Sequence, residues 1–313
     1  MMRLTIIGFG NQAKSWAQNL RDSGFPVIIA LQPNSLSFEK VKAMGFHTLE
    51  IGTPEFFLEK AFALLTPDHT HKTFLETYGS SFSHHSLMIY AHGFSVTESK
   101  LDKKFSNLHH VLFAPKAIGA EVRNQFLIKG KLGAVYSLEH VHHNKTEIES
   151  WVHDLARAVG INMGPYKTSF ERETKADLFS EQALLCSLIP YTADLMFENL
   201  IQTGVEPELA YLECWHELKL IMNAMIDKGP SAFFDLISPN ALIGSEKGFH
   251  RIMNDDFRKN VRSLLDEIES GQFNEELKKA SVEDHRKLIR ERWSKSKLNQ
   301  TFIDINRDPH EKT

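Results

Sequence analysis

The first thirteen residues restrict the fold of this chain more than any other stretch. The run Leu4–Ile7 has the apolar and β-branched character of a buried strand, and the turn Gly8-Phe9-Gly10 follows it directly. A helical pattern begins a few residues later and contains the small residue Ala13. This order of strand, G-x-G-x-x-A turn and helix is typical of a dinucleotide-binding α/β sheet. There Gly8 permits the tight turn, Gly10 lets the backbone approach a pyrophosphate, and Ala13 allows close packing of helix on strand.

The loop after the second predicted strand bears on the choice of nucleotide. That strand, residues 26–31, ends at Gln32, and the first acid beyond it is Glu39. An NAD site usually has an acid near this point to accept from the ribose 2′-hydroxyl. Ser35 and Ser37 instead offer hydroxyls that can donate to a 2′-phosphate, which favours NADP. Capping of the following helix is the alternative role for the same serines.

Strand and helix patterns alternate up to about Thr168 and predict a doubly wound parallel sheet. Ligands of such sheets lie beyond the carboxyl ends of the strands. Asp68, His92 and Lys116 each follow an apolar run and are therefore candidate site residues. For His92 or Lys116 taken singly, an ordinary loop position explains the residue equally well.

Composition excludes several classes of protein. With 36 basic and 40 acidic residues the formal net charge is −4, which gives no electrostatic reason to expect nucleic-acid binding. The two cysteines, Cys186 and Cys214, lie in predicted helices and indicate no disulfide framework, so a reducing, cytoplasmic location is expected. No run of about 18 apolar residues suggests a membrane span. The 16 histidines, several in pairs such as 84–85, 109–110 and 142–143, are interpreted as solvated loop residues.

Beyond Thr168 the pattern becomes almost continuously helical, so we expect two domains, residues 1–168 and residues 169–313. Two helices of the second domain carry acids four residues apart, which places each pair on one helix face. The pairs are Asp177 with Glu181 and Glu213 with Glu217.

Apolar residues continue the faces that carry both acid pairs, so the acids are predicted to point inward. These residues are Leu184, Leu185 and Leu188 on the first helix, and Leu209, Ala210, Leu220, Ile221 and Ala224 on the second. Four buried carboxylates need cations, and ligation by oxygen alone suits two Mg²⁺ ions about 4 Å apart. The alternative is that such acid pairs are common on solvated helices.

Six segments carry motifs that go beyond a general dinucleotide-binding fold. They are GFGNQAKSWAQNLRDSG from Gly8, LLTPD from Leu64, AHGF from Ala91, APKAIGAEVR from Ala114, TSFERETKADLFSEQALLC from Thr168 and GVEPELAYLECWHELKLI from Gly204. In order and spacing these segments resemble the ketol-acid reductoisomerase family over roughly residues 4–273. The length of the helical domain resembles the short form of the family, in which two chains interlock these domains.

The resemblance implies a Rossmann-type N-terminal domain, an all-α C-terminal domain and a cytoplasmic enzyme of branched-chain amino acid biosynthesis. Its cofactors would be NADP(H) and two Mg²⁺ ions. In the implied reaction an alkyl group migrates within a 2-hydroxy-2-methyl-3-keto acid such as acetolactate. Hydride from NADPH then yields a 2,3-dihydroxy acid. The resemblance also implies a homodimer or higher homo-oligomer, with Glu213 and Glu217 reaching the site from the partner chain.

The same resemblance assigns roles to individual residues. The cofactor-binding set is Gly8, Phe9, Gly10, Asn11, Gln12, Gln32, Ser35, Ser37, Asp68 and Gly119. The metal ligands are Asp177, Glu181, Glu213 and Glu217. The catalytic residues are His92 next to the nicotinamide, Lys116 beside a substrate oxygen, and Glu217. Ser238 and Cys186 are the residues expected to contact the substrate.

The chain departs from the family pattern at several positions near these residues. Gln32 stands where an arginine is usual, Ile118 replaces a proline, and Ser180, Ser187 and Leu188 replace glycines. Two alternatives follow, namely a relative that reduces another 2-keto acid, and a nucleotide-binding homologue without catalysis.

Overall fold

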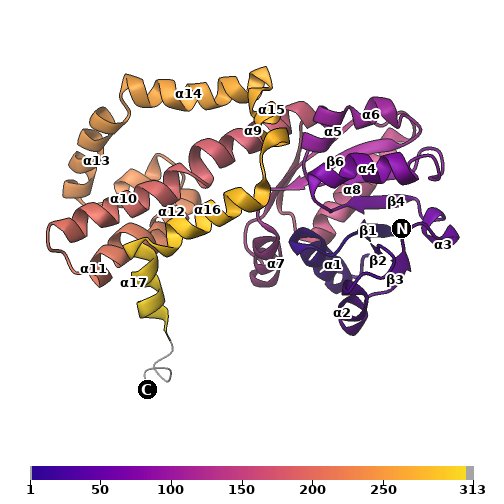
Figure 1. Cartoon of the computed structure of the whole chain (residues 1–313), viewed down its shortest axis with the longest axis horizontal. Coiled ribbons are helices and arrows are strands. Elements are labelled where there is room, and N and C mark those ends of the chain that lie inside the picture. The colour runs from indigo at the N-terminus through magenta and orange to yellow at the C-terminus, as the bar shows by residue number, and fades with distance from the viewer. Residues whose placement is uncertain (1, 308–313) are drawn as a thin grey trace. The chain divides into compact units, whose positions relative to one another are not determined.

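The computed structural model describes residues 2–307 and divides after Thr174 into two compact units, residues 1–174 and 175–313 (Figure 1). The terminal residues 1 and 308–313, which the two predicted domains include, lie outside the described part. The first unit is an α/β structure and the second is helical, as the sequence predicts.

One eight-stranded sheet forms the centre of the first unit, in the order β3-β2-β1-β4-β5-β6-β7-β8. The strands are β1 (Leu4–Ile7), β2 (Val27–Leu31), β3 (Thr48–Glu50), β4 (Ala61–Leu64), β5 (Leu87–Tyr90), β6 (His109–Pro115), β7 (Gly133–His140) and β8 (Met163–Lys167). Strands β1 to β6 pair in parallel, which confirms the doubly wound sheet. The sheet departs from the parallel arrangement between β6 and β7, which run antiparallel to each other, and β8 pairs in parallel with β7.

Helices cover both faces of this sheet (Figure 1). They are α1 (Asn11–Asp22), α2 (Ser37–Ala43), α3 (Pro54–Phe57), α4 (Asp68–Tyr78), α5 (Phe94–Ser99), α6 (Leu101–Lys104), α7 (Gly119–Ile128) and α8 (Lys145–Val159). One apolar cluster contains Trp16 of α1 and Trp151 of α8, and the other contains Phe56, Phe74 and Tyr90. Each fully buried side chain of this size contributes about 1.5–3 kcal/mol, so the two clusters fix the sheet that positions the loops.

The described part of the second unit consists of helices alone. They are α9 (Phe170–Ser180), which spans the division between the units, a π-helix η1 (Glu181–Leu185), α10 (Leu188–Gln202), α11 (Pro207–Tyr211), a π-helix η2 (Leu212–His216), α12 (Glu217–Lys228), a 3₁₀-helix η3 (Ala232–Asp235), α13 (Pro239–Ile252), α14 (Asp255–Ser270), α15 (Gln272–Lys279), α16 (Val282–Ser294) and α17 (Lys297–Asn306). Pro190 lies in the first turn of α10, where its missing N–H leaves no helical bond unmade.

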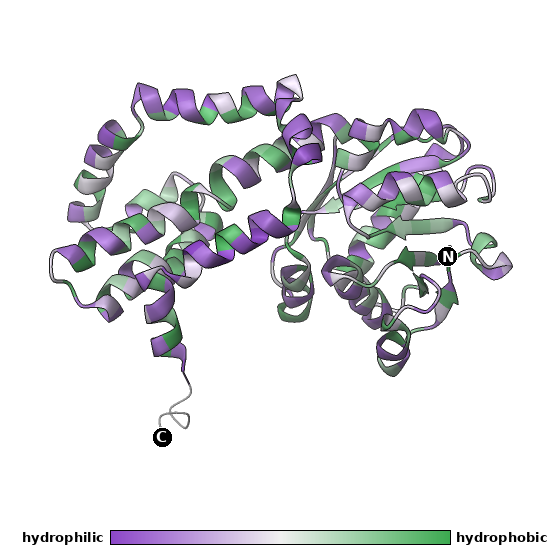
Figure 2. Cartoon of the chain, in the orientation of Figure 1, coloured by the Kyte–Doolittle hydropathy of each residue, from purple (hydrophilic) through white to green (hydrophobic). Residues whose placement is uncertain are grey.

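The second unit buries few of its apolar residues within one chain. Its cluster of buried residues consists of Phe197, Ala210, Tyr211 and Leu298. Many large apolar side chains of α10 to α13 are exposed instead, among them Leu220 at 56% and Ile243 at 72%. Figure 2 shows hydrophobic residues recurring along these helices, whereas the strands of the first unit are hydrophobic over most of their length.

The expected burial of the four acids is wrong for a single chain. Asp177 is half-buried, and Glu181, Glu213 and Glu217 are exposed. Of the apolar residues expected on the same faces, Leu184, Leu185, Leu209 and Leu220 are exposed, whereas Ala210 is buried. The described part of one chain therefore leaves much of these faces uncovered.

The helical stretch 170–202 has 33 residues and contains an 18-residue window with a mean hydropathy of 1.2, so it is long and apolar enough to cross a membrane by length and composition alone. A helix that is covered in an assembly passes the same test, so the stretch by itself does not indicate a membrane. Among the histidines, His109 and His110 are buried rather than solvated, because they begin β6 inside the sheet.

Candidate active site

The glycine turn has the backbone geometry that its sequence predicts. Gly8 has φ of +93°, which L side chains rarely adopt, and a Cβ on it would lie 2.9 Å from Cγ2 of Thr66. Around Gly10, by contrast, no heavy atom lies within 4 Å of an added Cβ, so its backbone is open to a ligand. Ala13 is completely buried under the sheet. The amino end of α1 therefore presents free space where a pyrophosphate is expected.

The loop that follows β6 packs against this turn. Gln12 donates from Nε2 to the carbonyl oxygen of Ala117 over 2.8 Å. An added Cβ on Gly119 would lie 2.5 Å from the carbonyl carbon and 2.6 Å from the oxygen of Asn11. The structure thus brings together Asn11, Gln12 and Gly119, three residues expected to bind the cofactor.

This close approach makes Gly119→Ala a sharp test of the nucleotide site. The clashing atoms are backbone atoms that cannot rotate away, so the loop must shift. We expect the free energy of unfolding to fall by about 1–3 kcal/mol. The KM for NADPH should rise at least about tenfold, since 1.4 kcal/mol of lost binding free energy suffices for that. Steady-state kinetics and thermal unfolding measure the two effects.

The control is Gly244→Ala in α13, where no heavy atom lies within 4 Å of the added Cβ. Stability there should be unchanged or higher by about 0.5–1 kcal/mol, because alanine favours a helix over glycine. Equal behaviour of the two variants would contradict the tight loop contact at Gly119.

The loop after β2 is compatible with both roles considered for Ser35 and Ser37, contact with a 2′-phosphate and capping of the following helix. Gln32 is exposed, and Ser35 and Ser37 are half-buried. The hydroxyl of Ser35 accepts from the backbone N–H of Ser37 over 3.3 Å, at the start of α2. Ser35 therefore supports the helix start, while its second lone pair and its own proton are left for another partner.

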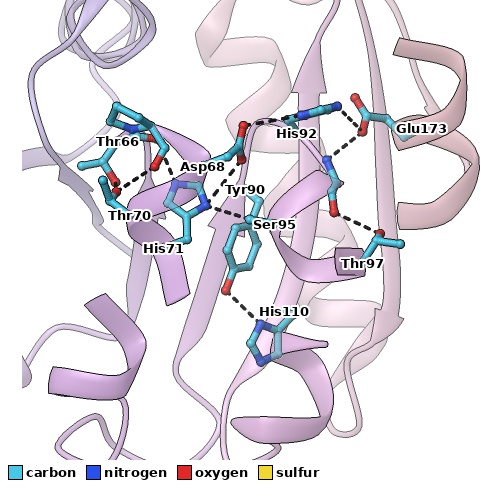
Figure 3. A network of polar contacts seen from close by, with 12 residues as sticks. Thr66, Asp68, Thr70, His71, Tyr90, His92, Ser95, Thr97, His110 and Glu173 are labelled. Atoms are coloured by element: carbon cyan, nitrogen blue, oxygen red, sulfur yellow. Dashed lines mark hydrogen bonds and ion pairs between the residues drawn. The ribbon is translucent and has the colours of Figure 1, made fainter. Parts of the chain in front are cut away.

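Polar side chains meet at the carboxyl ends of β4 and β5 (Figure 3). His92 follows β5, and its Nδ1 lies 3.6 Å from Oδ2 of Asp68, the first residue of α4. The imidazole of His92 stacks on the ring of Phe94 with centroids 6.1 Å apart. The sequence-predicted residues Asp68 and His92 are therefore neighbours, and the side chain of His92 is 21% exposed.

Glu173 occupies the centre of this site. The sequence analysis did not predict a role for this residue. Its Oε1 accepts from Nζ of Lys116 over 2.5 Å, and its Oε2 accepts from the backbone N–H of Gly93 over 2.7 Å. Oε2 also lies 3.8 Å from Nε2 of His92. The carboxylate is only 1% exposed, so it holds Lys116 and His92 in place in a low-dielectric environment.

A buried histidine ties two of these loops together. His71 of α4 contacts Oγ of Ser95 through Nδ1 at 2.7 Å and the carbonyl oxygen of Thr66 through Nε2 at 2.9 Å. Because a carbonyl oxygen only accepts, Nε2 must donate and Nδ1 accepts from the hydroxyl. Burial lowers the pKa of His71, which keeps the ring neutral and this pattern intact. The bonds fix the loops that carry Asp68 and His92.

Both acid-bearing helices contain a π-helical turn at the acids. Glu181 begins η1, Glu213 lies in η2 and Glu217 follows it directly. Such turns are rare and often occur at functional sites. Burial, followed by the charges of Glu181 and Asp177, raises the pKa of the Cys186 thiol. Cys186 therefore lies close enough to the first acid pair for their charges to act on its thiol, and its contact with a substrate stays a prediction.

Ser238 has a structural role in the single chain. It is the N-cap of α13, and its hydroxyl accepts from the backbone N–H of Ala241 over 3.2 Å. The residue is exposed. Its expected contact with a substrate carboxylate stays a prediction.

A glycine turn on a doubly wound sheet, a polar site at the strand ends and a helical unit rich in acids define a nicotinamide-nucleotide-dependent oxidoreductase. The family model of the acetohydroxy acid isomeroreductase NADPH-binding domain matches residues 2–169. The model of the ketol-acid reductoisomerase C-terminal domain matches residues 170–306. The chain belongs to the ketol-acid reductoisomerase family, which confirms the resemblance found in the sequence.

Individual relatives agree with this membership. A ketol-acid reductoisomerase (NADP(+)) of Xylella fastidiosa is 32% identical over 280 residues, covering 87% of this chain and 77% of the relative. One of Campylobacter concisus is 33% identical over 275 residues, covering 87% and 79%. The structure of an NADH-preferring ketol-acid reductoisomerase from an uncultured archean has a TM-score of 0.83 at 25% identity, covering 97% of this chain and 93% of that one.

Proposed function

We propose that the chain is an NADP-dependent ketol-acid reductoisomerase of branched-chain amino acid biosynthesis, acting in the cytoplasm. Its substrate is a 2-hydroxy-2-methyl-3-keto acid of the acetolactate type. An alkyl shift and a reduction convert this substrate into a 2,3-dihydroxy acid. The observation that carries the proposal is the ion pair of Lys116 with buried Glu173 beside His92, next to the nucleotide turn in a chain of this family.

The residues of the first unit account for binding and orientation. The turn from Gly8 to Gln12, with Gly119 against it, holds the pyrophosphate, and Gln32, Ser35 and Ser37 lie where the adenosine ribose is expected. His92 and Asp68 flank the nicotinamide. The ammonium of Lys116, fixed by Glu173, donates to an oxygen of the substrate and stabilises charge that develops there. Cys186 and Ser238 contact the rest of the substrate.

Asp177, Glu181, Glu213 and Glu217 fit two Mg²⁺ ions as ligands, because all four offer carboxylate oxygen atoms, which are the ligands that Mg²⁺ prefers. Glu173, Asp177 and Glu181 follow one another at intervals of four along α9 and η1, so they face the same side of the helix. Bound Mg²⁺ would supply the positive charge that polarises the ketone.

We place the boundary between the nucleotide-binding and metal-binding domains after residue 168.

Kinetics with purified protein test this proposal. Acetolactate, Mg²⁺ and NADPH together should give cofactor oxidation at a rate typical of enzymes, and omission of Mg²⁺ should abolish it. NADH in parallel reactions measures how far Gln32 shifts cofactor choice. Absence of turnover with either cofactor would contradict the proposal.

A relative that reduces another 2-keto acid is the second candidate, favoured by Ser187, Leu188 and Ile118 in place of family glycines and proline. Ile118 is 77% exposed and is the N-cap residue of α7 beside Lys116, so it changes the border of the site. A substrate panel that includes 3-hydroxy-3-methyl-2-ketobutyrate separates the two candidates. Turnover of that acid and of acetolactate excludes the second.

We also propose that two chains, or a larger even number, share the helical units. The single chain exposes apolar side chains on the faces that carry Glu213 and Glu217, including Leu209 and Leu220. Exposed apolar surface of this extent is typical of an interface. A partner chain covering it would also bury the acids, as the sequence pattern requires.

Sedimentation velocity of Leu220→Glu tests the shared helical units. Wild-type protein should sediment as a dimer or larger species, whereas a charge placed in the interface should give monomers with little activity. Leu58→Glu, at a 73% exposed position of the first unit, is the matched control and should leave both assembly and turnover unchanged. An active wild-type monomer would refute the shared site.

A further inference from the structure

Five histidines meet outside the site described above. His84 and His85 belong to the loop before β5, His109 begins β6, and His142 and His143 belong to the loop after β7. The ring centroids of His85 and His143 are 4.4 Å apart, and those of His85 and His109 are 4.9 Å apart. The ring centroids of His109 and His143 are 6.2 Å apart, those of His84 and His85 are 6.2 Å apart, and those of His109 and His142 are 6.0 Å apart.

The position of this cluster separates it from the reaction. It lies at the amino ends of β5 and β6, and the antiparallel β7 brings its carboxyl end to the same edge of the sheet. His92 and Lys116 follow the opposite ends of β5 and β6. Since a strand rises about 3.3 Å per residue, the seven residues of β6 put roughly 20 Å between His109 and Lys116.

Two rings of the cluster respond to the other imidazoles around them. Burial, followed by the charges of His85, His142 and His143, lowers the pKa of His109 to about 4. Burial and then the charges of neighbouring histidines also lower the pKa of His85. The ionisable neighbours that act on these two rings are thus other imidazoles. Imidazole nitrogens are thus the donor atoms that this cluster offers to a ligand.

We infer that His85, His109 and His143 bind one late transition-metal ion of the Zn²⁺, Ni²⁺ or Cu²⁺ class. His109 is the fixed member, because it is 2% exposed and its Nδ1 accepts from the backbone N–H of His142 over 3.4 Å. His85 and His143 are exposed on loops, so their rings can rotate toward a shared ion. Imidazole suits these ions, with metal–nitrogen distances of about 2.0–2.1 Å, whereas Mg²⁺ prefers oxygen. His84 and His142 are available as a fourth ligand.

The test is calorimetric titration of the untagged full chain with Zn²⁺ in the presence of excess Mg²⁺, which occupies oxygen ligands. We expect one Zn²⁺ per chain in the wild type and binding at least about tenfold weaker in His85→Asn and in His143→Asn. Asparagine is chosen because His85 has φ of +66°, which asparagine tolerates. The control His47→Asn changes an exposed histidine in the segment before β3 and should bind like the wild type.

Two further measurements distinguish a specific metal site from histidine rings that only pack against one another. Zn²⁺ should raise the Tm of the wild type and of His47→Asn, but not of the double variant His85→Asn/His143→Asn. Cu²⁺ should bind more tightly than Zn²⁺, and its paramagnetic resonance spectrum should show coupling to nitrogen that the double variant loses. Zn²⁺ binding or Tm shifts that are equal in the wild type and the double variant would overturn the inference.

Discussion

Glu217→Gln is expected to lower kcat by at least about 100-fold while leaving NADPH binding unchanged. Amide nitrogen replaces one of the oxygen atoms that we propose as ligands, and the lost carboxylate charge weakens the hold on Mg²⁺. Metal ions contribute several kcal/mol to stabilising developing charge, and each 1.36 kcal/mol corresponds to a tenfold change in rate. Initial rates as a function of Mg²⁺ concentration should show an apparent affinity weakened about 10- to 100-fold.

Glu208→Gln provides the matched control for Glu217→Gln. Glu208 is also an exposed acid, on α11 two elements earlier, and has no proposed role in metal binding. Its replacement should change neither kcat nor the dependence on Mg²⁺. If Glu217→Gln kept wild-type turnover at low Mg²⁺, the second acid pair would not be a metal site and the case for sharing it between chains would fail.

The first unit could be predicted largely from the sequence because its determinants are local. Apolar runs of strand length, the conformational demand at Gly8 and the small Ala13 each specify structure within a few residues. The edge strand β8 lacked such a pattern, since its sequence MGPYK includes glycine and proline and is mostly exposed. The antiparallel direction of β7 depends on its pairing with β6, for which the sequence offered no local indication.

The acid pairs show where sequence reasoning stops. The spacing predicts that Asp177 with Glu181, and Glu213 with Glu217, lie on apolar helix faces. It could not say what covers those faces, because an apolar stripe has the same pattern whether its partner lies in the same chain or in another. Leu184 and Leu220 are exposed in one chain. Contacts between chains, rather than the fold of one chain, therefore have to explain their apolar character.

Glu173 could have been found from the sequence, because it stands four residues before Asp177 and extends the series 173, 177, 181. The spacing does not reveal that the carboxylate of Glu173 accepts hydrogen bonds from Lys116 and Gly93. Those contacts join residues more than fifty positions apart, and only the packing of α9 against the sheet creates them. The histidine cluster was missed for the same reason, since two separate loops and the start of β6 supply its rings.

Glu173→Gln should therefore lower both stability and turnover. An amide has one acceptor where the carboxylate has two, so its NH₂ group must face either Nζ of Lys116 or the N–H of Gly93, both of which are donors. Leaving one such buried group unsatisfied costs about 1–3 kcal/mol. We expect a loss of about 2 kcal/mol in the free energy of unfolding. We also expect a kcat about 100-fold lower with little change in the KM for NADPH, since the ammonium of Lys116 is no longer fixed.

A double-mutant cycle with Lys116→Met distinguishes positioning of Lys116 from a general loss of stability. The side chain of Lys116 is 37% exposed, so Lys116→Met removes the charge without opening a cavity. If Glu173 stabilises the fold mainly by holding Lys116, the two substitutions should be non-additive by about 1 kcal/mol or more in unfolding free energy. Glu171→Gln, on the exposed side of the same helix, should be silent in both assays. Additive effects in the cycle would show that Glu173 stabilises the fold through contacts other than the one with Lys116.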